Sequence, residues 1–381
     1  MAEEAENAGG IAMCHTIVNF AWRDAKPAGR YSSGVCLHGH TMHSEECLSF
    51  LPRYLRQVPG VSQVVSGYER GPRPVDFARA YWTPPLSPVS ALRVEQAQIA
   101  EMGLRPLVSL TDHDNIEAPM SLQVTADPRH VPVSVEWTVP YERSILHLGV
   151  HNLPAASARR WMSAMAAYTA APVEEQLPDL LSELARIPSV LIALNHPFWL
   201  EEGVVEADHH RALDRVLREC LERIHALELN GTRTWKENTA VVELARRHER
   251  PLISGGDRHA CEPAACINLT QAATFSEFVS EIRDGHSSVW FLAHYREPMA
   301  LRVLEASRDI LRHYPEYPGR ERWTDRVFYR GIDGIARPVS VVWRERVPWM
   351  LTAAAGLLQV SAGSLRPALR LILAQRGEIL P

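Results

Sequence analysis

The chain has 381 residues, of which 46% are hydrophobic and 22% are charged, and its formal net charge is −5. This composition is typical of a globular protein that can bury a large core, and it gives no whole-chain attraction for nucleic acids or membranes. Six cysteines in so long a chain predict no disulfide framework, and the acidic N-terminus is unlike a secretory signal. The most apolar late stretch is too short to span a membrane. We therefore expect a cytoplasmic protein with reduced cysteines.

Short apolar segments alternate with helical patterns between residues 34 and 293. Strands are predicted at Val35–His38, Leu107–Thr111, Val131–Glu136, Ile145–Val150, Val190–Asn195, His225–Leu229, Pro251–Ser254 and Ser288–Ala293. Helices are predicted at Ser90–Gly103, Ser157–Tyr168, Pro178–Ile187, His210–Leu221, Glu237–His248 and Ser276–Gly285. Alternation of this kind favours a parallel sheet, and about seven such units favour its closure. The sequence therefore predicts an α/β fold with a (β/α) barrel.

Three regions lie outside this alternation. Residues 46–89 are rich in proline and predict a long inserted loop that could act as a lid. Residues 294–381 form a predicted C-terminal appendage, mostly helical, with a final helix at Trp349–Arg376, and residues 1–33 form an N-terminal segment. Residues 296–381 contain 14 arginines and 9 acidic residues, a net of +5, which leaves −10 for the rest. That balance disfavours a nucleic-acid substrate, although it does not exclude one.

Residues able to bind a metal follow the predicted strands. The first strand ends in His38-Gly39-His40, and side chains two residues apart on a strand point the same way, so both histidines can hold one ion. Further polar residues occur at Thr111-Asp112-His113-Asp114, Glu136, His147, Asn195-His196, Glu228-Leu229-Asn230 and Asp257-Arg258-His259. Each alone has an ordinary explanation, such as a hydrogen-bonded core histidine or an aspartate that caps a loop. Together they would meet at one rim of a barrel, and buried charges need partners, so a metal centre is predicted.

This ordered set resembles the PHP (polymerase and histidinol phosphatase) domain metallohydrolases over residues 34–293. The family pattern HxHTxxSD is matched by His38, His40, Thr41, Ser44 and Glu45, and the pattern TDHD by Thr111–Asp114. The remaining family ligands are matched by Glu136, His147, His196, Asp257 and His259. The resemblance implies a distorted seven-stranded TIM-like barrel that holds two or three divalent metal ions. Nitrogen and oxygen ligands suit Zn, Mn or Fe.

The resemblance also implies how the ligands are shared. One metal would be held by His38, His40, Glu136 and Asp257, a second by Glu136, His147 and His196, and a third by Glu45, His113 and His259. Hydroxide formed on these metals would be the nucleophile, and the catalytic residues would be His38, His40, Glu136, His196 and Asp257. Glu45 replaces the usual aspartate, so the third position departs most from the family pattern.

Substrate binding is less clearly indicated. Arg159, Arg160, Arg233 and Asn230 are candidates to bind a phosphate, because a guanidinium can bind it through two hydrogen bonds, although each arginine could equally be a surface residue. Arg258 lies between two ligands on a strand end, so its side chain is expected to point away from them. Phe198-Trp199 stands where phosphatase relatives often have glycine and arginine, which suits an apolar substrate.

These features predict a metal-dependent phosphoesterase that acts on a small phosphorylated metabolite or nucleotide. One alternative keeps the metals but cleaves a carbamate or a carboxylic ester. A second alternative is a non-catalytic, metal-binding regulatory barrel. The sequence indicates no oligomeric state.

Overall fold

The computed structural model describes residues 11–13, 16–24, 27–49, 76–343, 355–356 and 380–381. The predicted helix at Trp349–Arg376 and the middle of the predicted inserted loop lie outside these residues. Within the described part of the chain, no helix is both long enough and apolar enough to cross a membrane. The five cysteines that the structure describes form no disulfide.

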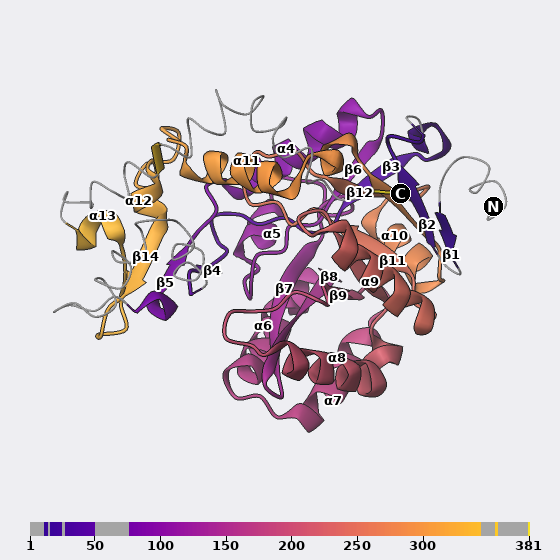
Figure 1. Cartoon of the computed structure of the whole chain (residues 1–381), viewed down its shortest axis with the longest axis horizontal. Coiled ribbons are helices and arrows are strands. Elements are labelled where there is room, and N and C mark those ends of the chain that lie inside the picture. Colours follow the sequence, from indigo (N-terminus) through magenta and orange to yellow (C-terminus); the bar gives the residue numbers. More distant parts are fainter. Residues whose placement is uncertain (1–10, 14–15, 25–26, 50–75, 344–354, 357–379) are drawn as a thin grey trace.

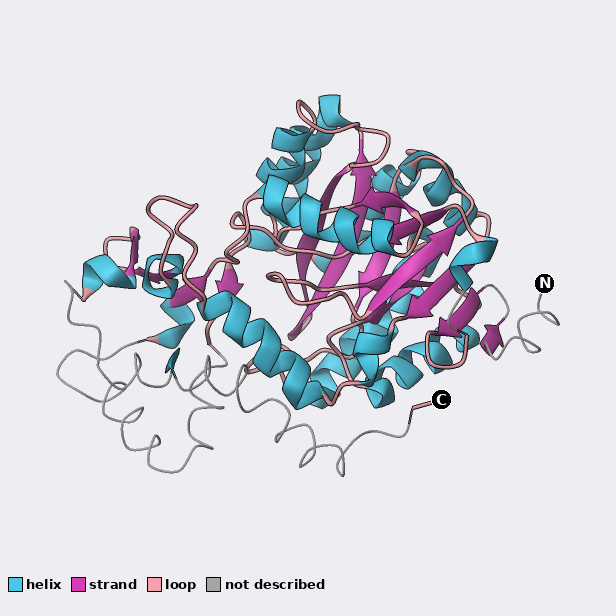
Figure 2. Ribbon diagram, turned by 90° about the horizontal axis from the view of Figure 1, so that it is seen from above, coloured by secondary structure: helices cyan, strands magenta, loops and turns pink. Residues whose placement is uncertain are grey.

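Two mixed sheets make up the body of the molecule, with helices packed around them (Figure 2). The first has the order β1 (Ile11–Met13), β2 (Thr16–Phe20), β13 (Ser287–Phe291), β12 (Cys266–Thr270), β3 (Ser33–Cys36) and β6 (Arg105–Val108). The second has the order β11 (Leu252–Gly255), β10 (Ala226–Asn230), β9 (Leu191–Asn195), β8 (Ser144–Leu153) and β7 (Val133–Tyr141). All eight predicted strands are therefore present, and β1, β2 and β12 were missed.

The prediction of a parallel arrangement was wrong for part of the second sheet. Strands β7 and β8 pair in antiparallel fashion, and β8 pairs in the same way with β9. Only Glu142 and Arg143 connect β7 to β8, and Glu142 has a φ of 52°, which is the left-handed conformation of a tight turn. So short a connection leaves no room for a crossover helix, and an antiparallel hairpin results.

Backbone pairing closes no barrel among the described strands, so the predicted seven-stranded barrel is not shown. The two sheets are joined instead by isolated bridges between Gly39 and Arg258 and between His113 and Glu136. Asn268 on β12 adds a further link, because its side chain accepts from Ser254 N and donates to Ser254 O and to Val35 O. The junctions therefore lie where the ligand-type residues follow their strands.

Helices cover the outer faces of the two sheets. They are α4 (Pro88–Glu101), α5 (Glu117–Leu122), α6 (Ala155–Ala170), α7 (Leu177–Ala185), α8 (Glu206–Cys220), α9 (Trp235–Arg247) and α10 (Phe275–Arg283). Helix α9 begins with a capping box formed by Thr234 and Glu237, which satisfies the first free backbone N–H groups. The largest core cluster packs α6, α7 and α8 against β7, β8 and β9, with Trp137 and Tyr141 fully buried in it. This core makes β7 a rigid support for Glu136.

A third, smaller sheet joins the two ends of the predicted insertion to the C-terminal part of the chain. Its order is β15 (Ala336–Pro338), β14 (Val327–Arg330), β5 (Ala80–Trp82) and β4 (Glu46–Cys47). It lies at one side of the molecule, beside α12 (Trp323–Arg326) and α13 (Val339–Val342), and α11 (Met299–Leu311) extends from it along the main body (Figure 1). The described ends of residues 46–89 thus contain the short strands β4 and β5, and the described part of the appendage combines helices α11, α12 and α13 with strands β14 and β15.

Arg326 stabilises this C-terminal region. Its side chain is buried and donates hydrogen bonds of 2.7–3.0 Å to the carbonyl oxygens of Ile310, Arg312, Arg320 and Glu321. Replacing one such donor leaves several buried acceptors without a partner.

We expect Arg326→Met to lower the free energy of unfolding by about 3 kcal/mol, because buried carbonyls lose their hydrogen bonds at no gain elsewhere. Chemical denaturation monitored by tryptophan fluorescence measures the change. Arg337→Met is the matched control, because Arg337 pairs with Asp333 on an exposed hairpin. An Arg326 variant as stable as this control would contradict the role given to the guanidinium.

Candidate metal centre

The predicted ligands come together at one end of the strands. Gly39 and Arg258 form a parallel bridge in which His40 N donates to Arg258 O over 2.8 Å. This bridge holds the segment after β3 beside the segment after β11, so that His38 and His40 face Asp257. The described structure therefore brings together the following ligand-type residues: His38, His40, Glu46, His113, Glu136, His147, His196, Asp257 and His259.

Glu136 is at the centre of this cluster. It is only 1% exposed, and five imidazole rings face its carboxylate. The nearest contacts between a ring nitrogen and a carboxylate oxygen are 2.8 Å (His38), 3.5 Å (His40), 3.5 Å (His113), 3.6 Å (His147) and 3.1 Å (His196). Asn195 donates to Oε1 over 3.0 Å and fixes the carboxylate plane. One carboxylate is thus placed to serve more than one metal position.

Four overlapping groups have ligand atoms within 4.8 Å of one another. They are His38–Glu136–His196, His38–His40–Asp257, His40–Glu46–His259 and His40–His113–Glu136. The group His38–His40–Asp257 falls within the first set that the resemblance implied, whereas His38–Glu136–His196 combines residues of the first and second sets, and His147 belongs to none of the four groups. The other two lie around His40 and Glu46.

Glu46 rather than Glu45 faces His113 and His259, contrary to the sequence prediction. Glu46 Oε2 lies 3.5 Å from the Nε2 atoms of both His113 and His259, and its side chain is 12% exposed. The Glu45 side chain is 56% exposed and contacts Arg330 over 3.4 Å. Adjacent residues of an extended segment point to opposite faces, and the pairing of Glu46 with Trp82 determines which of the two faces the cluster.

Hydrogen bonds fix the orientation of three histidine rings. Glu228 Oε1 lies 2.6 Å from His38 Nδ1, and the carbonyl oxygen of Asp257 lies 3.0 Å from His259 Nδ1. Ser44 Oγ donates to Glu46 and lies 3.3 Å from His40 Nδ1, so its lone pair can accept from that ring. A ring that keeps its proton on Nδ1 in these contacts would present its Nε2 lone pair toward the carboxylates.

This arrangement fits a bound metal. A lone pair that faces a carboxylate is repulsive unless a cation lies between them, and buried His40 Nε2 has no hydrogen-bond partner. Oriented imidazoles backed by carboxylate or carbonyl acceptors are the usual environment of metal-binding histidines. The donor set contains nitrogen and oxygen only, which suits the expected Zn, Mn or Fe.

Burial and the nearby carboxylates set the protonation of the metal-free rings. Burial, followed by the charge of His259, lowers the pKa of His40 to about 4. Burial also lowers the pKa of His38, but Glu136 and Glu228 outweigh it and raise that pKa well above its usual value. In the same way burial is outweighed at His259 by Glu46, and the pKa of this ring rises to about 9.

Backbone strain is concentrated at the cluster. Asp114, His196 and Asp257 have φ values of 48°, 26° and 49°, although none of them is glycine. Conformations of this kind persist only where the surrounding structure holds them, and they are common at functional sites. His196 is held by its N–H, which donates to Glu228 Oε2 over 2.8 Å.

Two predicted phosphate-binding residues do not reach the cluster. Arg159 and Arg160 are exposed on α6, where Arg159 pairs with Glu117 over 3.1 Å and Arg160 lies over Trp161. Both follow β8 in the chain, but their helix runs along the outside of the sheet. The prediction that Arg258 points away is confirmed, since it is buried against Glu95 at 3.2 Å.

Arg233 and Asn230 do lie at the cluster. Asn230 Nδ2 donates to Asp257 Oδ2 over 3.3 Å, and Arg233 Nη2 lies 3.4 Å from the same oxygen. The Arg233 guanidinium stacks on Trp199 with 3.8 Å to the ring centroid, and its buried Nε has no hydrogen-bond partner. These residues line a small pocket together with His196 and Phe198.

Several residues of the centre were not assigned a role from the sequence. Glu46 was passed over for its neighbour, and Glu228 and Asn195 were noted only as polar residues at strand ends. Their signal was a charge or amide within an otherwise apolar strand, since Glu228 is 1% exposed and buried charges require partners. Asp112 behaves as the loop-capping alternative suggested, accepting from Thr41 N and Thr41 Oγ1 over 2.5 and 2.7 Å.

Comparisons with known proteins identify no family for the chain. No family model and no curated protein matches it. Among solved structures, PsfC from Pseudomonas syringae is similar at 15% identity and a TM-score of 0.38, over 56% of this chain and 88% of that one. An amidohydrolase from Chromobacterium violaceum, with bound sulfate and no metal, is similar at 15% identity and a TM-score of 0.30, over 47% of this chain and 84% of that one. A candidate metal-dependent phosphoesterase from Bifidobacterium adolescentis is similar at 13% identity and a TM-score of 0.31, over 53% of this chain and 92% of that one.

We expect Glu46→Gln to weaken metal binding at the His40–Glu46–His259 group by at least about tenfold, because even an outer partner of a ligand contributes that much. Glu45→Gln is the matched control and should bind metal as the unaltered chain does. Titration with a chelator, followed by metal analysis, compares the two. Weaker metal binding in Glu45→Gln alone would instead identify Glu45 as the ligand, as the family pattern indicated.

Metal uptake should release protons and strengthen as pH rises. The metal-free His259 ring, with a pKa of about 9 against an ordinary 6.5, is protonated at neutral pH, and a metal must displace that proton. Apparent affinity therefore increases up to about pH 9 and falls on acidification. Calorimetry in buffers of different ionisation enthalpy gives the number of protons released per metal bound. Release of no protons at neutral pH would contradict displacement of the His259 proton by the metal.

Proposed function

We propose that this chain is a metal-dependent hydrolase of the PHP type that cleaves phosphate esters of a small metabolite or nucleotide. The observation that supports it most directly is the buried cluster around Glu136, in which five imidazoles face one carboxylate. A non-catalytic role explains less, because a site that only stabilises the fold needs fewer ligands than this. We further propose that the two sheets are the halves of a distorted barrel, in keeping with the bridges that join them.

We take the ligand sets from the family resemblance, with Glu46 in place of Glu45. His38, His40, Glu136 and Asp257 would hold one ion, Glu136, His147 and His196 a second, and Glu46, His113 and His259 a third. Ions bound in these positions would supply Lewis acidity and lower the pKa of a bound water. The chain itself orients the ligands, because Glu228 fixes His38, and Asn195 fixes Glu136.

Arg233 is the residue best placed to bind a phosphoryl oxygen. Stacking on Trp199 holds its guanidinium beside Asp257, and its Nε is buried without a partner. A planar guanidinium with a free donor matches the geometry of phosphate better than that of an uncharged ester. Asn230 and Thr232 donate to the same Asp257 Oδ2 that Arg233 contacts, over 3.3 and 2.9 Å, so this oxygen is shared among three donors.

The carbamate or carboxylic ester alternative rests on Phe198 and Trp199 beside His196. These partly buried aromatic side chains would suit an apolar group. The free donor of Arg233 has no evident use for such a substrate, and we therefore favour phosphate. A small molecule is the proposed partner, because the ligands are buried and the net charge of residues 1–295 is negative.

A panel of p-nitrophenyl phosphate, bis(p-nitrophenyl) phosphate and p-nitrophenyl acetate tests the proposal on metal-loaded protein. We expect phosphate-ester turnover that falls at least about a thousandfold in His40→Ala, since this ring belongs to three of the four ligand groups. His286→Ala removes an exposed histidine after α10 and should leave the rate unchanged. Turnover of the acetate alone would favour the carbonyl alternative, and no turnover by a metal-loaded chain would favour the non-catalytic one.

Arg233→Lys separates the two hydrolase proposals further. Lysine keeps the charge but loses the planar stacking on Trp199 and the second donor. We expect KM for the phosphate ester to rise about tenfold while acetate turnover stays unchanged. Equal effects on both substrates would show that Arg233 acts through Asp257 rather than through phosphate.

A further inference from the structure

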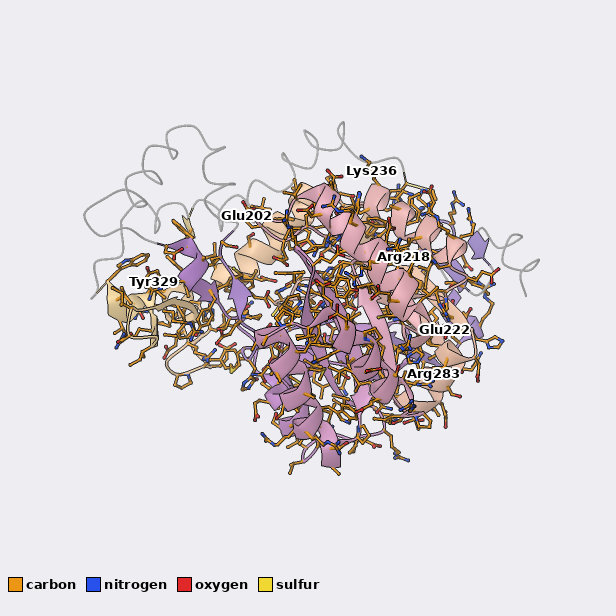
Figure 3. All side chains as sticks on the ribbon, turned by 90° about the horizontal axis from the view of Figure 1, so that it is seen from below. Glu202, Arg218, Glu222, Lys236, Arg283 and Tyr329 are labelled. Carbon is orange, nitrogen blue, oxygen red and sulfur yellow. The ribbon has the colours of Figure 1, made fainter. Side chains whose placement is uncertain are left out.

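The strand that carries Glu46 depends on the C-terminal part of the chain. Among the described residues, β4 pairs with β5 and with no other strand, through Glu46–Trp82 and Cys47–Tyr81. Strand β5 pairs in turn with β14, through Trp82–Val327, Tyr81–Phe328 and Ala80–Tyr329. Figure 3 shows Tyr329 on this small sheet, at the opposite end of the molecule from Arg283 on α10. The side of β4 that faces the cluster is therefore determined by its pairing in the small sheet, which contains no strand of the two main sheets.

Arg320 joins this sheet to the segment that contains the ligands. Its Nη1 donates to Met42 O and to Thr83 Oγ1, both over 3.0 Å. Met42 lies between His40 and Glu46, and Thr83 directly follows β5. The N–H of Thr83 donates to Arg326 O over 2.9 Å, so the Arg320–Arg326 segment holds Thr83 from two sides. One guanidinium thus connects the segment that leads into β4 with the residue that follows β5.

The same sheet reaches the ligand cluster directly. The ring of Trp82 lies 5.6 Å from the ring of His259, and Trp82 is the residue that pairs with Glu46. A movement of β5 would therefore move Trp82, whose ring packs against His259 and whose backbone pairs with Glu46. His147 and His196 lie on or directly after β8 and β9, which belong to the second sheet and not to the small one.

We propose that Arg320 is a positioning residue for the metal position formed by Glu46, His113 and His259, so that the C-terminal segment sets the metal affinity of that position alone. The inference rests on the proposed metal-binding function and adds a dependence that this function does not require. Arg320 touches no ligand atom and acts by fixing Met42 and Thr83. The two positions built on Glu136 should not respond to it.

Metal binding by the full chain tests this directly. Arg320→Ala should weaken one zinc equivalent by about 10–100-fold, the range typical of groups that orient a ligand, while the other equivalents keep their affinity. Thr83→Val removes only the hydroxyl acceptor and should change the same equivalent in the same direction by a smaller factor. Arg320→Lys, which can keep one of the two hydrogen bonds, should restore part of the affinity. Arg337→Ala, on the exposed β15 side of the same sheet, is the matched control and should change nothing.

Thermal unfolding of the metal-free variants separates positioning from a general loss of structure. We expect Thr83→Val and Arg320→Lys to unfold at the temperature of the unaltered chain while their weak equivalent is displaced by less chelator. Unchanged affinity in Thr83→Val and Arg320→Ala, or equal weakening of every equivalent, would overturn the inference. An unaltered chain that binds no zinc would instead contradict the proposed function, and one that binds only at the Glu136 positions would overturn this inference alone.

Discussion

Glu136 is 1% exposed, and a carboxylate at that depth is stable only where positive charge or several donors surround it. Five imidazoles and the amide of Asn195 meet this requirement in the structure. They come from four strands, β3, β6, β8 and β9, so satisfying one buried charge fixes where those strands lie relative to one another. The backbone bridges between His113 and Glu136 and between Gly39 and Arg258 hold these segments in the same relative positions.

The outer supports of the cluster divide its ligands into two kinds. Glu136, His147 and His196 lie on or next to β7, β8 and β9, which pack against the largest core. Glu46 lies instead on a two-residue strand that depends on residues far away in the chain. The first group is held by buried apolar area and the second by a few hydrogen bonds, so the two should differ in rigidity.

Much of the centre could be predicted because its residues follow buried strands in a fixed order. The strand positions needed only the period of apolar residues, and the position of polar residues after them gave the candidates. The selection of nine ligands among those candidates came from the family resemblance, and eight of the nine lie in the cluster. The choice between Glu45 and Glu46 could not be made this way, because it depends on which residue pairs with Trp82, a contact set by β14. Nor could the sequence show that α6 carries Arg159 and Arg160 away from the cluster, since direction in space is a tertiary property. The antiparallel hairpin at Glu142 was accessible in principle, because no helical segment separates the two strands.

The contact between Arg320 and Met42 joins residues 278 positions apart. During synthesis, the N-terminal segment that bears His38 and His40 leaves the ribosome long before its partner exists. The strands that support Glu136 can associate once residues up to about β9 have emerged, whereas Glu46 acquires its final orientation only after β14 has been translated. A chain without residues 320–330 would therefore carry most of the candidate ligands and still lack the sheet that orients Glu46, so the order in which the cluster forms depends on when this segment is made.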